Sequence, residues 1–308
     1  MKILLITFSG TNNTFICGEF LKKHLEGLNH QVEHYLYNAR RHFNYNLNEF
    51  DLIGIGYPIH AFNLPKPFFK FLTSLKVNKK IDYFIYKVSG EPFALNSASS
   101  ATLNSKLKKK GFNLVYEKHF LMPYNIMFNY NDSIKKEMYL YLEKLTLVTA
   151  LTLNNKEYRK VSYNPFYRFI SFIFRIEWIA GPINSKLTYV DKKKCIKCYK
   201  CIKECPTKSL YIDKNDKIKI KSSCCICTKC VHDCPTDAFR FGFLNLWRVN
   251  GAFNYPKLVN DKENKGNYIN KNTKGYFKLF KKYYRNQNEL LKKYNIEIPN
   301  VFLKDEIL

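Results

Sequence analysis

The sequence lacks the segments that mark transmembrane, secreted and nucleic-acid-binding proteins. It has no uninterrupted apolar run long enough to span a bilayer, and its first apolar stretch, Met1 to Ile6, is too short for a signal peptide. It has no Arg-rich arm and no recognised nucleic-acid motif, although 51 lysine and arginine residues stand against 25 aspartate and glutamate residues. We therefore expect a cytoplasmic protein with no transmembrane segment and no nucleic-acid partner.

Cysteine, in contrast, is concentrated in two short runs. Each run has the spacing C-x2-C-x2-C-x3-C and is followed by proline, and the second run repeats the first 29 positions later. The eight residues are Cys195, Cys198, Cys201, Cys205, Cys224, Cys227, Cys230 and Cys234. Three thiolates at i, i+3 and i+6 can hold three corners of a cuboidal iron–sulfur cluster, whereas the fourth, set apart and followed by proline, ligates the other cluster.

This spacing predicts two 4Fe–4S clusters with crossed ligands. We assign one cluster to Cys195, Cys198, Cys201 and Cys234, and the other to Cys224, Cys227, Cys230 and Cys205. A zinc site would leave the third cysteine of each run without a role, and disulfides would need an oxidising compartment. The remaining cysteines, Cys17 and Cys225, are expected to be reduced thiols, Cys225 as a bystander beside Cys224. His232, inside the second run, is a candidate hydrogen-bond donor near sulfur.

Apolar periodicity predicts strands that alternate with helices in the first half of the chain. The predicted strands are residues 2–8, 31–37, 51–57, 80–89 and 113–120, and the predicted helices are residues 14–28, 66–75, 97–110 and 132–153. This alternation indicates an α/β doubly wound parallel sheet of strand order 2-1-3-4-5. Such sheets bind ligands beyond the carboxyl ends of their strands, at the switch point between the first and third strands.

The loop after the first predicted strand is a candidate phosphate site. Residues 9–14 (SGTNNT) offer hydroxyl and amide donors at the start of a helix, and the N-terminus of a helix attracts anions. A helix cap without a ligand is the alternative explanation of the same residues. Gly54 and Gly56 resemble the start of a dinucleotide fingerprint, but Pro58 and Ile59 interrupt it, so we reject that interpretation.

Residues 8–14 (FSGTNNT) resemble the flavodoxin phosphate loop, T/S-x-T-G-x-T. Residues 57–62 and 89–93 occupy the places where flavodoxins hold the isoalloxazine ring of FMN. A flavodoxin-like half joined to a small α+β two-cluster ferredoxin half resembles the bacterial flavodoxin–ferredoxin fusion family, the EFR-type ferredoxins. The resemblance implies that FMN is bound by Ser9, Gly10, Thr11, Asn12, Asn13, Thr14, Pro58, Ile59, His60, Ala61, Phe62, Ser89, Gly90 and Glu91.

Two of these positions have particular features. Asn12 stands where the family has glycine, and asparagine is the least costly replacement if the backbone there has a positive φ. His60 is the one histidine in a proposed ligand loop. A contact between His60 and the flavin is one interpretation, and an exposed loop histidine is the simpler one.

The chain divides into four predicted segments. Residues 1–155 form the flavodoxin-like FMN-binding domain, 156–184 a helical linker, 185–245 the ferredoxin domain, and 246–308 a basic extension with one amphipathic helix. The linker helix is expected to begin at Asn164-Pro165, to end at Gly181-Pro182, and to pack between the two domains. A basic amphipathic surface helix that touches lipid or a partner is the alternative.

We also expect three features in the C-terminal extension. Leu246, Trp247 and Arg248 are expected to pack on the second cysteine run, and residues 260–272 to be loosely attached. A helix over residues 273–294 is expected to pack on the body through its apolar face.

The function that these features predict is electron transfer between two 4Fe–4S clusters and an FMN site in the same chain. The net charge of +26 favours acidic redox partner proteins. One alternative is a flavin-dependent reductase with a small substrate, but neither a nucleophile–base constellation nor a nicotinamide fingerprint supports it. Another is a ferredoxin whose first domain has lost FMN and serves as a docking module. We therefore expect an electron carrier more than a substrate-specific enzyme.

Overall fold

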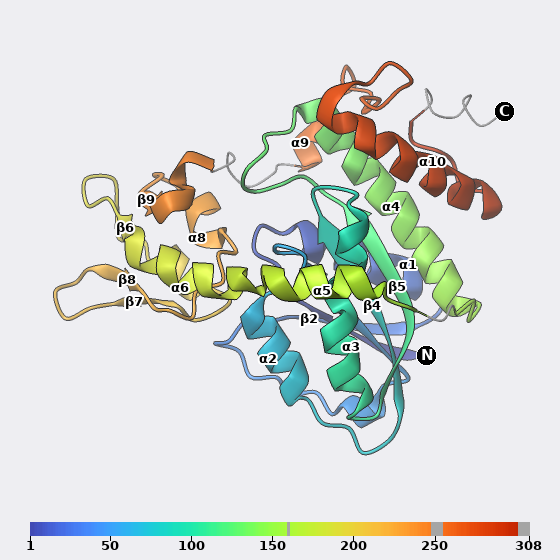
Figure 1. Cartoon of the computed structure of the whole chain (residues 1–308), viewed down its shortest axis with the longest axis horizontal. Coiled ribbons are helices and arrows are strands. Elements are labelled where there is room, and N and C mark those ends of the chain that lie inside the picture. The colour runs from blue at the N-terminus through green and yellow to red at the C-terminus, as the bar shows by residue number, and fades with distance from the viewer. Residues whose placement is uncertain (159–160, 248–254, 301–308) are drawn as a thin grey trace.

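The computed structural model describes residues 1–158, 161–247 and 255–300, which form a large sheet domain and a small cluster domain joined by a long helix (Figure 1). The sheet domain contains a five-stranded parallel sheet of order β2-β1-β3-β4-β5. Its strands are β1 (Lys2–Thr7), β2 (Gln31–Leu36), β3 (Leu52–Pro58), β4 (Ile81–Ser89) and β5 (Phe112–Leu121). The predicted flavodoxin-like strand order is therefore confirmed.

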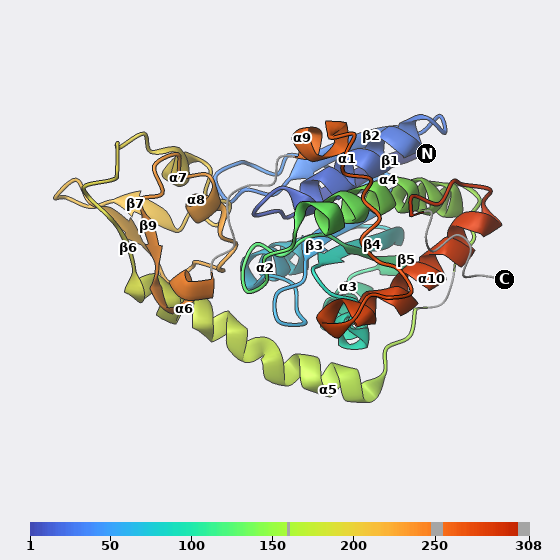
Figure 2. The same ribbon diagram turned by 90° about the horizontal axis from the view of Figure 1, so that it is seen from above.

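Helices cover both faces of this sheet (Figure 2). On one face lie α1 (Asn13–Glu26) and α4 (Asp132–Asn154), and on the other lie α2 (Lys66–Ser74) and α3 (Ala101–Lys108). Successive side chains of a strand point to opposite faces, so Phe84 and Tyr86 enter the first core whereas Tyr83 and Ile85 enter the second. Short 3-10 turns, η1 (Leu47–Glu49) and η2 (Ala94–Ser100), precede β3 and α3.

The C-terminal extension packs on the sheet domain through α9 (Tyr255–Asn260), η5 (Gly275–Phe277) and α10 (Lys278–Lys293). Phe280, Tyr284 and Leu291 of α10 are fully buried against the core beneath α4, which confirms the predicted amphipathic helix.

The expectation that residues 260–272 are loosely attached is wrong. The Glu137 carboxylate accepts the backbone N–H groups of Tyr268 and Ile269, at 2.8 and 2.9 Å, and the Ile269 side chain is fully buried. A buried carboxylate in α4 therefore fixes a segment that looks polar and unstructured in sequence.

A nearly continuous helix runs from the sheet domain to the cluster domain (Figure 2). It consists of α5 (Pro165–Ile173), η3 (Phe174–Ile176) and α6 (Glu177–Leu187). Asn164 caps it as predicted, since its side chain accepts the N–H groups of Phe166 and Tyr167. The predicted end at Gly181-Pro182 is wrong, because both residues lie inside α6. Gly181 is required there because a Cβ would lie 2.4 Å from the carbonyl oxygen of Cys224.

The cluster domain consists of two antiparallel strand pairs and two short helices. β6 (Thr188–Val190) pairs with β9 (Phe239–Phe241), and β7 (Leu210–Ile212) pairs with β8 (Ile218–Ile220). The helices are α7 (Lys200–Lys203) and α8 (Lys229–His232), and the 3-10 turn η4 (Gly242–Trp247) follows β9. The apolar core is small and is made largely by Leu210, Val231, Phe239 and Phe241.

The expected packing of residues 246–248 on the second cysteine run is wrong for the two residues that the structure describes. Leu246 is 91% exposed and Trp247 is 54% exposed. Arg248 lies outside the described residues. Within the described ranges, no helix has the length and apolar character needed to cross a membrane.

Candidate functional site

The two cysteine runs have the same local backbone geometry. Residues with positive φ occur in three pairs that are 29 positions apart: Lys197 and Ile226, Tyr199 and Thr228, and Lys208 and Asp237. Tyr199 and Thr228 directly precede α7 and α8, so each run turns sharply before its short helix. The sequence repeat is therefore a structural repeat, and it presents the cysteines of both runs in the same way.

The structure brings the cysteines together in two crossed groups. Cys195, Cys198, Cys201 and Cys234 line one small cavity. Burial, together with the neighbouring thiols of this group including Cys234, raises the pKa of Cys201 to about 11. In the other group, burial raises the pKa of Cys224 to about 12, with added contributions from Cys227 and Cys205. Each fourth cysteine thus lies with the first three of the other run.

Backbone N–H groups point at the fourth cysteine of each run. The N–H of Ser209 donates to the Sγ of Cys205, and the N–H of Ala238 donates to the Sγ of Cys234, both at 3.3 Å. Such donors stabilise a thiolate and orient it as a ligand. All ten cysteines are free thiols. Among the described residues, no three potential ligands lie close enough together to share a single metal ion.

The two groups differ in their exposure to solvent. Cys198 of the first group is exposed, whereas Cys227 and Cys205 of the second group are buried. Exposed lysines surround the first run at Lys192, Lys193, Lys194, Lys197, Lys200 and Lys203. The first group is therefore accessible from a basic surface, and the second lies against the sheet domain.

A cavity of about 60 Å³ lies at the carboxyl edge of the sheet. Of the residues predicted for FMN, it is lined by Ser9, Gly10, Thr11, Asn13, Thr14, Pro58, Ile59, His60, Ser89 and Gly90, and not by Asn12, Ala61, Phe62 or Glu91. The structure thus brings together parts of all three predicted loops, which are residues 9–14 (the first loop), 57–62 (the second loop) and 89–93 (the third loop). Met122, Pro123, Tyr124, Asn125, Cys227 and Val88 complete the wall, and sequence reasoning missed this role for all six. The first four directly follow β5, which lies beside β4 in the parallel sheet. Because the carboxyl ends of parallel strands meet at one edge, the end of β5 was the signal that could have identified them.

The first loop has the features of an anion site. Asn12 has a φ of 71°, as expected for a residue at the family's glycine position. The Oγ1 of Thr14 is buried and has no hydrogen-bond partner, so an acceptor bound at the N-terminus of α1 would satisfy it. Asn13 has a structural role instead, because its amide donates to the carbonyl of Pro123 and its oxygen accepts from Tyr255.

The second loop is held under backbone strain beside the cluster domain. Ala61 and Phe62 both have positive φ, at 40° and 60°. The simpler interpretation of His60, an exposed loop histidine, is wrong, since its side chain is only 16% exposed. Burial lowers the pKa of His60 to about 4, although a hydrogen bond to the backbone of Cys225 opposes this shift. His60 therefore contacts the second cysteine run.

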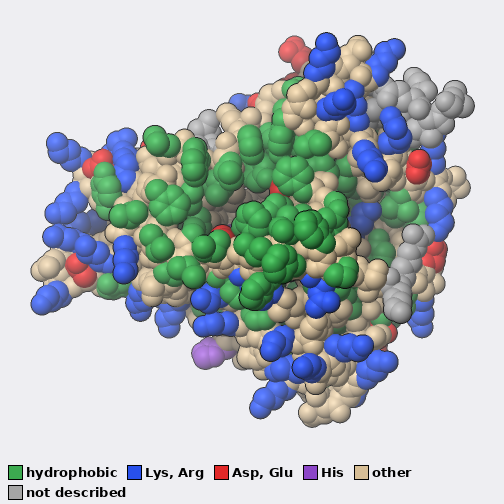
Figure 3. Space-filling model, viewed as in Figure 1, with side chains coloured by type: hydrophobic (Ala, Val, Ile, Leu, Met, Phe, Trp, Pro, Cys, Tyr) green, Lys and Arg blue, Asp and Glu red, His purple; other side chains and the backbone are tan. Residues whose placement is uncertain are grey.

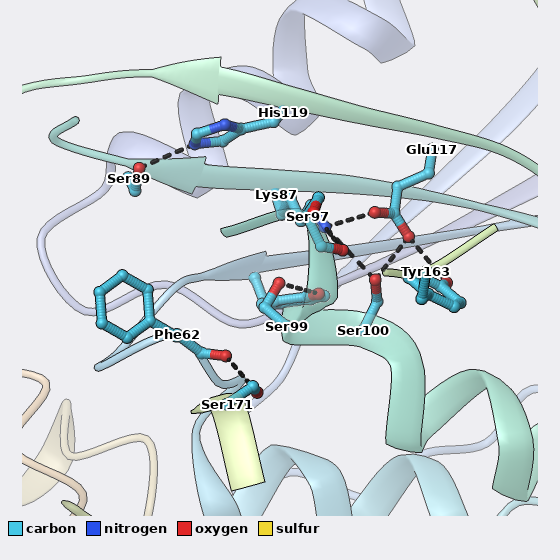
Figure 4. A network of polar contacts seen from close by, with 11 residues as sticks. Phe62, Lys87, Ser89, Ser97, Ser99, Ser100, Glu117, His119, Tyr163 and Ser171 are labelled. Atoms are coloured by element: carbon cyan, nitrogen blue, oxygen red, sulfur yellow. Dashed lines mark hydrogen bonds and ion pairs between the residues drawn. The ribbon is translucent and has the colours of Figure 1, made fainter. Parts of the chain in front are cut away.

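The third loop rests on a network of buried polar groups (Figure 4). The Oγ of Ser89 contacts Nε2 of His119 at 2.7 Å and donates to the carbonyl of Glu91 at 2.8 Å. Burial raises the pKa of the Glu91 carboxyl to about 7, and one of its oxygens has no partner. A Cβ on Gly90 would lie 2.4 Å from the ring of Tyr124, so only glycine fits beneath that ring.

A buried ion pair lies in the strands that lead to the third loop. The ammonium of Lys87 in β4 contacts the carboxylate of Glu117 in β5, and both side chains are at least nine-tenths buried. Glu117 also accepts the hydroxyls of Ser100 and Tyr163, at 2.5 and 3.1 Å (Figure 4). These contacts join β4 and β5 to η2 and to the segment that leads into α5.

The second cysteine run lies directly on the sheet-edge cavity. A Cβ on Gly10 would lie 2.2 Å from the carbonyl oxygen of Cys227, so the first loop and the cluster loop are in backbone contact. Asn125 donates to the Oγ1 of Thr228 at 2.8 Å and accepts from Nε2 of His232 at 3.0 Å. This His232 nitrogen therefore binds the sheet domain and not a sulfur.

Cys225 is not the bystander that its position beside Cys224 suggests. Its thiol hydrogen-bonds the sulfur of Cys227, and this bond lowers the pKa of Cys227. Both residues also pack into the core on the α2 and α3 side of the sheet. Arg40 ties the first run to the same domain through the carbonyls of Ile202 and Leu210, each at 3.1 Å.

Comparisons with known proteins agree with the cysteine spacing. Residues 187–270 match the 4Fe-4S dicluster domain family, which confirms iron–sulfur clusters as the expected cofactors of this segment. No curated protein matches the chain in sequence. Among solved structures, oxidised flavodoxin 1 from Bacillus cereus is 14% identical, with a TM-score of 0.37, and the match covers 51% of this chain and 96% of that one. A flavodoxin from the domain Archaea is 13% identical, with a TM-score of 0.35, over 50% of this chain and 99% of that one. The fold assignment rests on the strand order itself.

Proposed function

We propose that this protein transfers electrons between two 4Fe–4S clusters and an FMN bound at the sheet edge. The observation that carries the proposal is the backbone contact between Gly10 of the phosphate loop and Cys227 of the second run. His60 of the second loop also hydrogen-bonds the backbone of the adjacent Cys225. A cluster held by Cys227 would therefore touch two of the loops that surround the flavin site.

The different exposure of the two cysteine groups suggests a route for electrons through the molecule. The first group opens to solvent at Cys198 and is surrounded by exposed lysines, which suits docking of an acidic redox protein. The second group is shielded by the sheet domain. Electrons would enter or leave through the first cluster and reach the flavin site through the second.

The residues at the sheet edge fit the phosphate end of FMN. Three buried hydroxyls, on Ser9, Thr11 and Thr14, lie at the N-terminus of α1, and that of Thr14 has no protein partner. A cavity of about 60 Å³ has room for a phosphate group, whereas sites for whole small molecules measure about 300–1,000 Å³. The ring would therefore require Tyr124 or the Cys227 loop to move. When bound, the flavin would supply a centre that takes one or two electrons, in contrast to the single electrons that clusters pass.

The small cavity also favours a second candidate function, a two-cluster carrier without flavin. In this case residues 1–155 are a docking platform for the ferredoxin domain of residues 185–245. The same contacts at Gly10, Asn125 and Arg40 would then serve only to hold the two domains together.

Cofactor analysis separates the two candidates. The full-length protein is purified without oxygen, and its iron, sulfide and flavin are measured before and after incubation with FMN. We expect about eight iron atoms per chain, as two 4Fe–4S clusters require. Flavin retained after gel filtration supports the coupled carrier, and its absence after reconstitution supports the flavin-free carrier. A colourless, iron-free protein would overturn both.

A further inference from the structure

The helix formed by α5, η3 and α6 has its polar side toward the protein and its apolar side toward solvent. Its outward residues mostly recur every three or four positions, with a consecutive run at residues 172–174, and are 41–69% exposed. They are Phe166, Phe169, Phe172, Ile173, Phe174, Ile176, Ile179, Ile183 and Leu187, here called the apolar ridge. A surface helix of a globular protein normally has the opposite orientation, because burial of its apolar stripe stabilises it. The helix does pack against both domains as expected, through Ser171 and Trp178 on the sheet domain and Gly181 on the cluster domain, but neither domain covers its apolar ridge.

Polar contacts fix this orientation. Ser171 is 3% exposed and donates to the carbonyl of Phe62 at 2.8 Å (Figure 4). On the next turns, Arg175 donates to Asn63 and Trp178 donates from its indole N–H to the carbonyl of Leu64. Rotation of the helix to bury the ridge would break all three contacts and leave buried polar groups unsatisfied. The exposure of the ridge is therefore built into the fold.

The ridge is long and belongs to a larger apolar face (Figure 3). From Phe166 to Leu187 the helix extends for roughly 30 Å at 1.5 Å per residue. η4 packs against α6 and adds exposed Phe243, Leu246 and Trp247. Monomeric soluble proteins rarely expose contiguous apolar faces of this extent, and such faces mark sites of association with proteins or membranes.

The chemistry of the ridge fits a lipid surface better than a protein. The nine ridge residues are all phenylalanine, isoleucine or leucine and carry no hydrogen-bonding group. Protein interfaces also favour phenylalanine, but they combine it with tyrosine, tryptophan and arginine and are only partly apolar. Figure 2 shows the helix along an outer edge of the molecule. A long apolar ridge of this kind suits insertion among acyl chains.

The charges around the ridge match an anionic membrane. Arg168 and Lys186 on the helix are exposed, and Lys66 and Lys70 lie beside Trp178. The one acidic residue of the helix, Glu177, has a side chain only 21% exposed. Figure 3 shows blue lysine and arginine side chains around much of the green face. A net charge of +26 adds long-range attraction to anionic headgroups.

We propose that the protein binds the surface of an anionic membrane through the apolar ridge, with the helix lying in the plane of the interface. Because the polar face of the same helix holds the second loop through Phe62 and Asn63, the sheet-edge cavity is braced by the membrane-bound element. The clusters and the cavity would then act next to a membrane and not in free solution.

Vesicle flotation tests this proposal. Full-length protein, purified without oxygen, is floated with vesicles of phosphatidylcholine alone or with phosphatidylglycerol added. We expect binding to the phosphatidylglycerol vesicles that weakens at high salt. A double variant, Phe169→Ser with Ile176→Ser, removes side chains that are 60% and 69% exposed. It should lower the fraction bound by about tenfold or more, because burial of each large apolar side chain contributes substantially.

A matched variant controls for general loss of surface hydrophobicity. Leu279→Ser with Ile212→Ser removes residues that are 49% and 44% exposed but lie outside the ridge, and it should bind as the unchanged protein does. Three results would overturn the proposal: no binding to anionic vesicles, equal binding to neutral ones, or equal loss in both double variants. Sedimentation in lipid-free buffer provides a further test. If the unchanged protein is a dimer that Phe169→Ser with Ile176→Ser converts to monomer, the ridge binds a second copy and not lipid.

Discussion

The carbonyl oxygen of Cys227 lies so close to Gly10 that a Cβ at position 10 would be 2.2 Å away from it. No side chain can be accommodated there unless the Cys227 loop moves away from the loop of residues 9–14. Gly10→Ala should therefore cost about 1–3 kcal/mol of stability, as overpacking does, and should widen the contact between the domains. Chemical denaturation under anaerobic conditions measures the first effect, and the rate of flavin reduction after cluster reduction measures the second.

Gly27→Ala is the matched control for this substitution. Gly27 follows α1 and has an ordinary helical φ of −61°, and a Cβ at this position would have no neighbouring atom nearer than 3.4 Å. We expect little change in either measurement. If Gly10→Ala behaved like Gly27→Ala, the close contact between loop and cluster would be refuted.

The crossed cysteine groups predict which cluster each substitution damages. Cys205→Ala should remove a ligand from the cluster of Cys224, Cys227 and Cys230, although residue 205 belongs to the first run. Low-temperature EPR of the reduced protein should then lose the signal of one cluster and keep that of the other, and Cys224→Ala should give the same remaining spectrum. Cys17→Ser, at a buried thiol outside both runs, should leave iron content unchanged. Matching spectra from Cys205→Ala and Cys195→Ala would contradict the crossed arrangement.

The unpartnered hydroxyl of Thr14 makes a specific prediction about FMN. Thr14→Val keeps the shape of the side chain and removes a hydrogen bond to a charged phosphate, which contributes about 1.5–3 kcal/mol. FMN affinity, measured by titration of the flavin-free protein, should fall by roughly tenfold or more, with little effect on folding. Thr149→Val, at a buried threonine of α4 far from the loops in sequence, controls for loss of a buried hydroxyl. Equal affinities of the unchanged and Thr14→Val proteins would place the phosphate elsewhere.

Because the Lys87–Glu117 ion pair is buried, loss of one partner should lower the free energy of unfolding. Lys87→Met leaves the Glu117 carboxylate buried without its cation, and removal of one partner of a buried pair typically costs about 3–5 kcal/mol. Lys87→Met with Glu117→Leu removes both charges and should recover much of that loss. Urea denaturation of the three proteins gives the comparison. If the double variant were no more stable than Lys87→Met, the unpaired Glu117 carboxylate would not be the cause of the stability lost in Lys87→Met.

The largely enclosed His119 should make the protein less stable in mild acid. Burial lowers the pKa of His119 to about 3, and the charges of Lys87 and Lys118 act in the same direction. The unfolded chain, with a histidine pKa near 6.5, therefore takes up the proton first as pH falls, so the free energy of unfolding decreases from about pH 6.5 towards pH 3.

The size of this effect is about 1.4 kcal/mol per pH unit for one such histidine. His119→Gln cannot be protonated and should flatten the pH dependence of stability between pH 4 and 6.5 by up to that amount. His42→Gln, at an exposed position, is the control and should keep the slope of the unchanged protein. Identical slopes for His119→Gln and the unchanged protein would show that His119 is protonated in the folded state.

Features that depend on local pattern could be predicted before any fold was known. The spacing of the cysteines indicated the cluster type, the 29-residue repeat indicated two equivalent runs, and alternation of strands and helices indicated the strand order. The capping of α5 by Asn164 and the positive φ of Asn12 also follow from neighbouring residues. Such features can be predicted from sequence because ligand spacing, helical periodicity and turn geometry each depend on a few neighbouring residues.

What these elements face, in contrast, depends on contacts between distant parts of the chain. Helical periodicity identifies the residues that share a side of α5 and α6, but Ser171 and its partner in the second loop decide that the apolar side points to solvent. In the same way, contacts across the domain boundary bury His60 and pack Cys225 and Cys227 into the core of the sheet domain. These relationships join residues more than 100 positions apart or depend on them, and the free energies that set them come from packing and hydrogen bonds that no local pattern encodes.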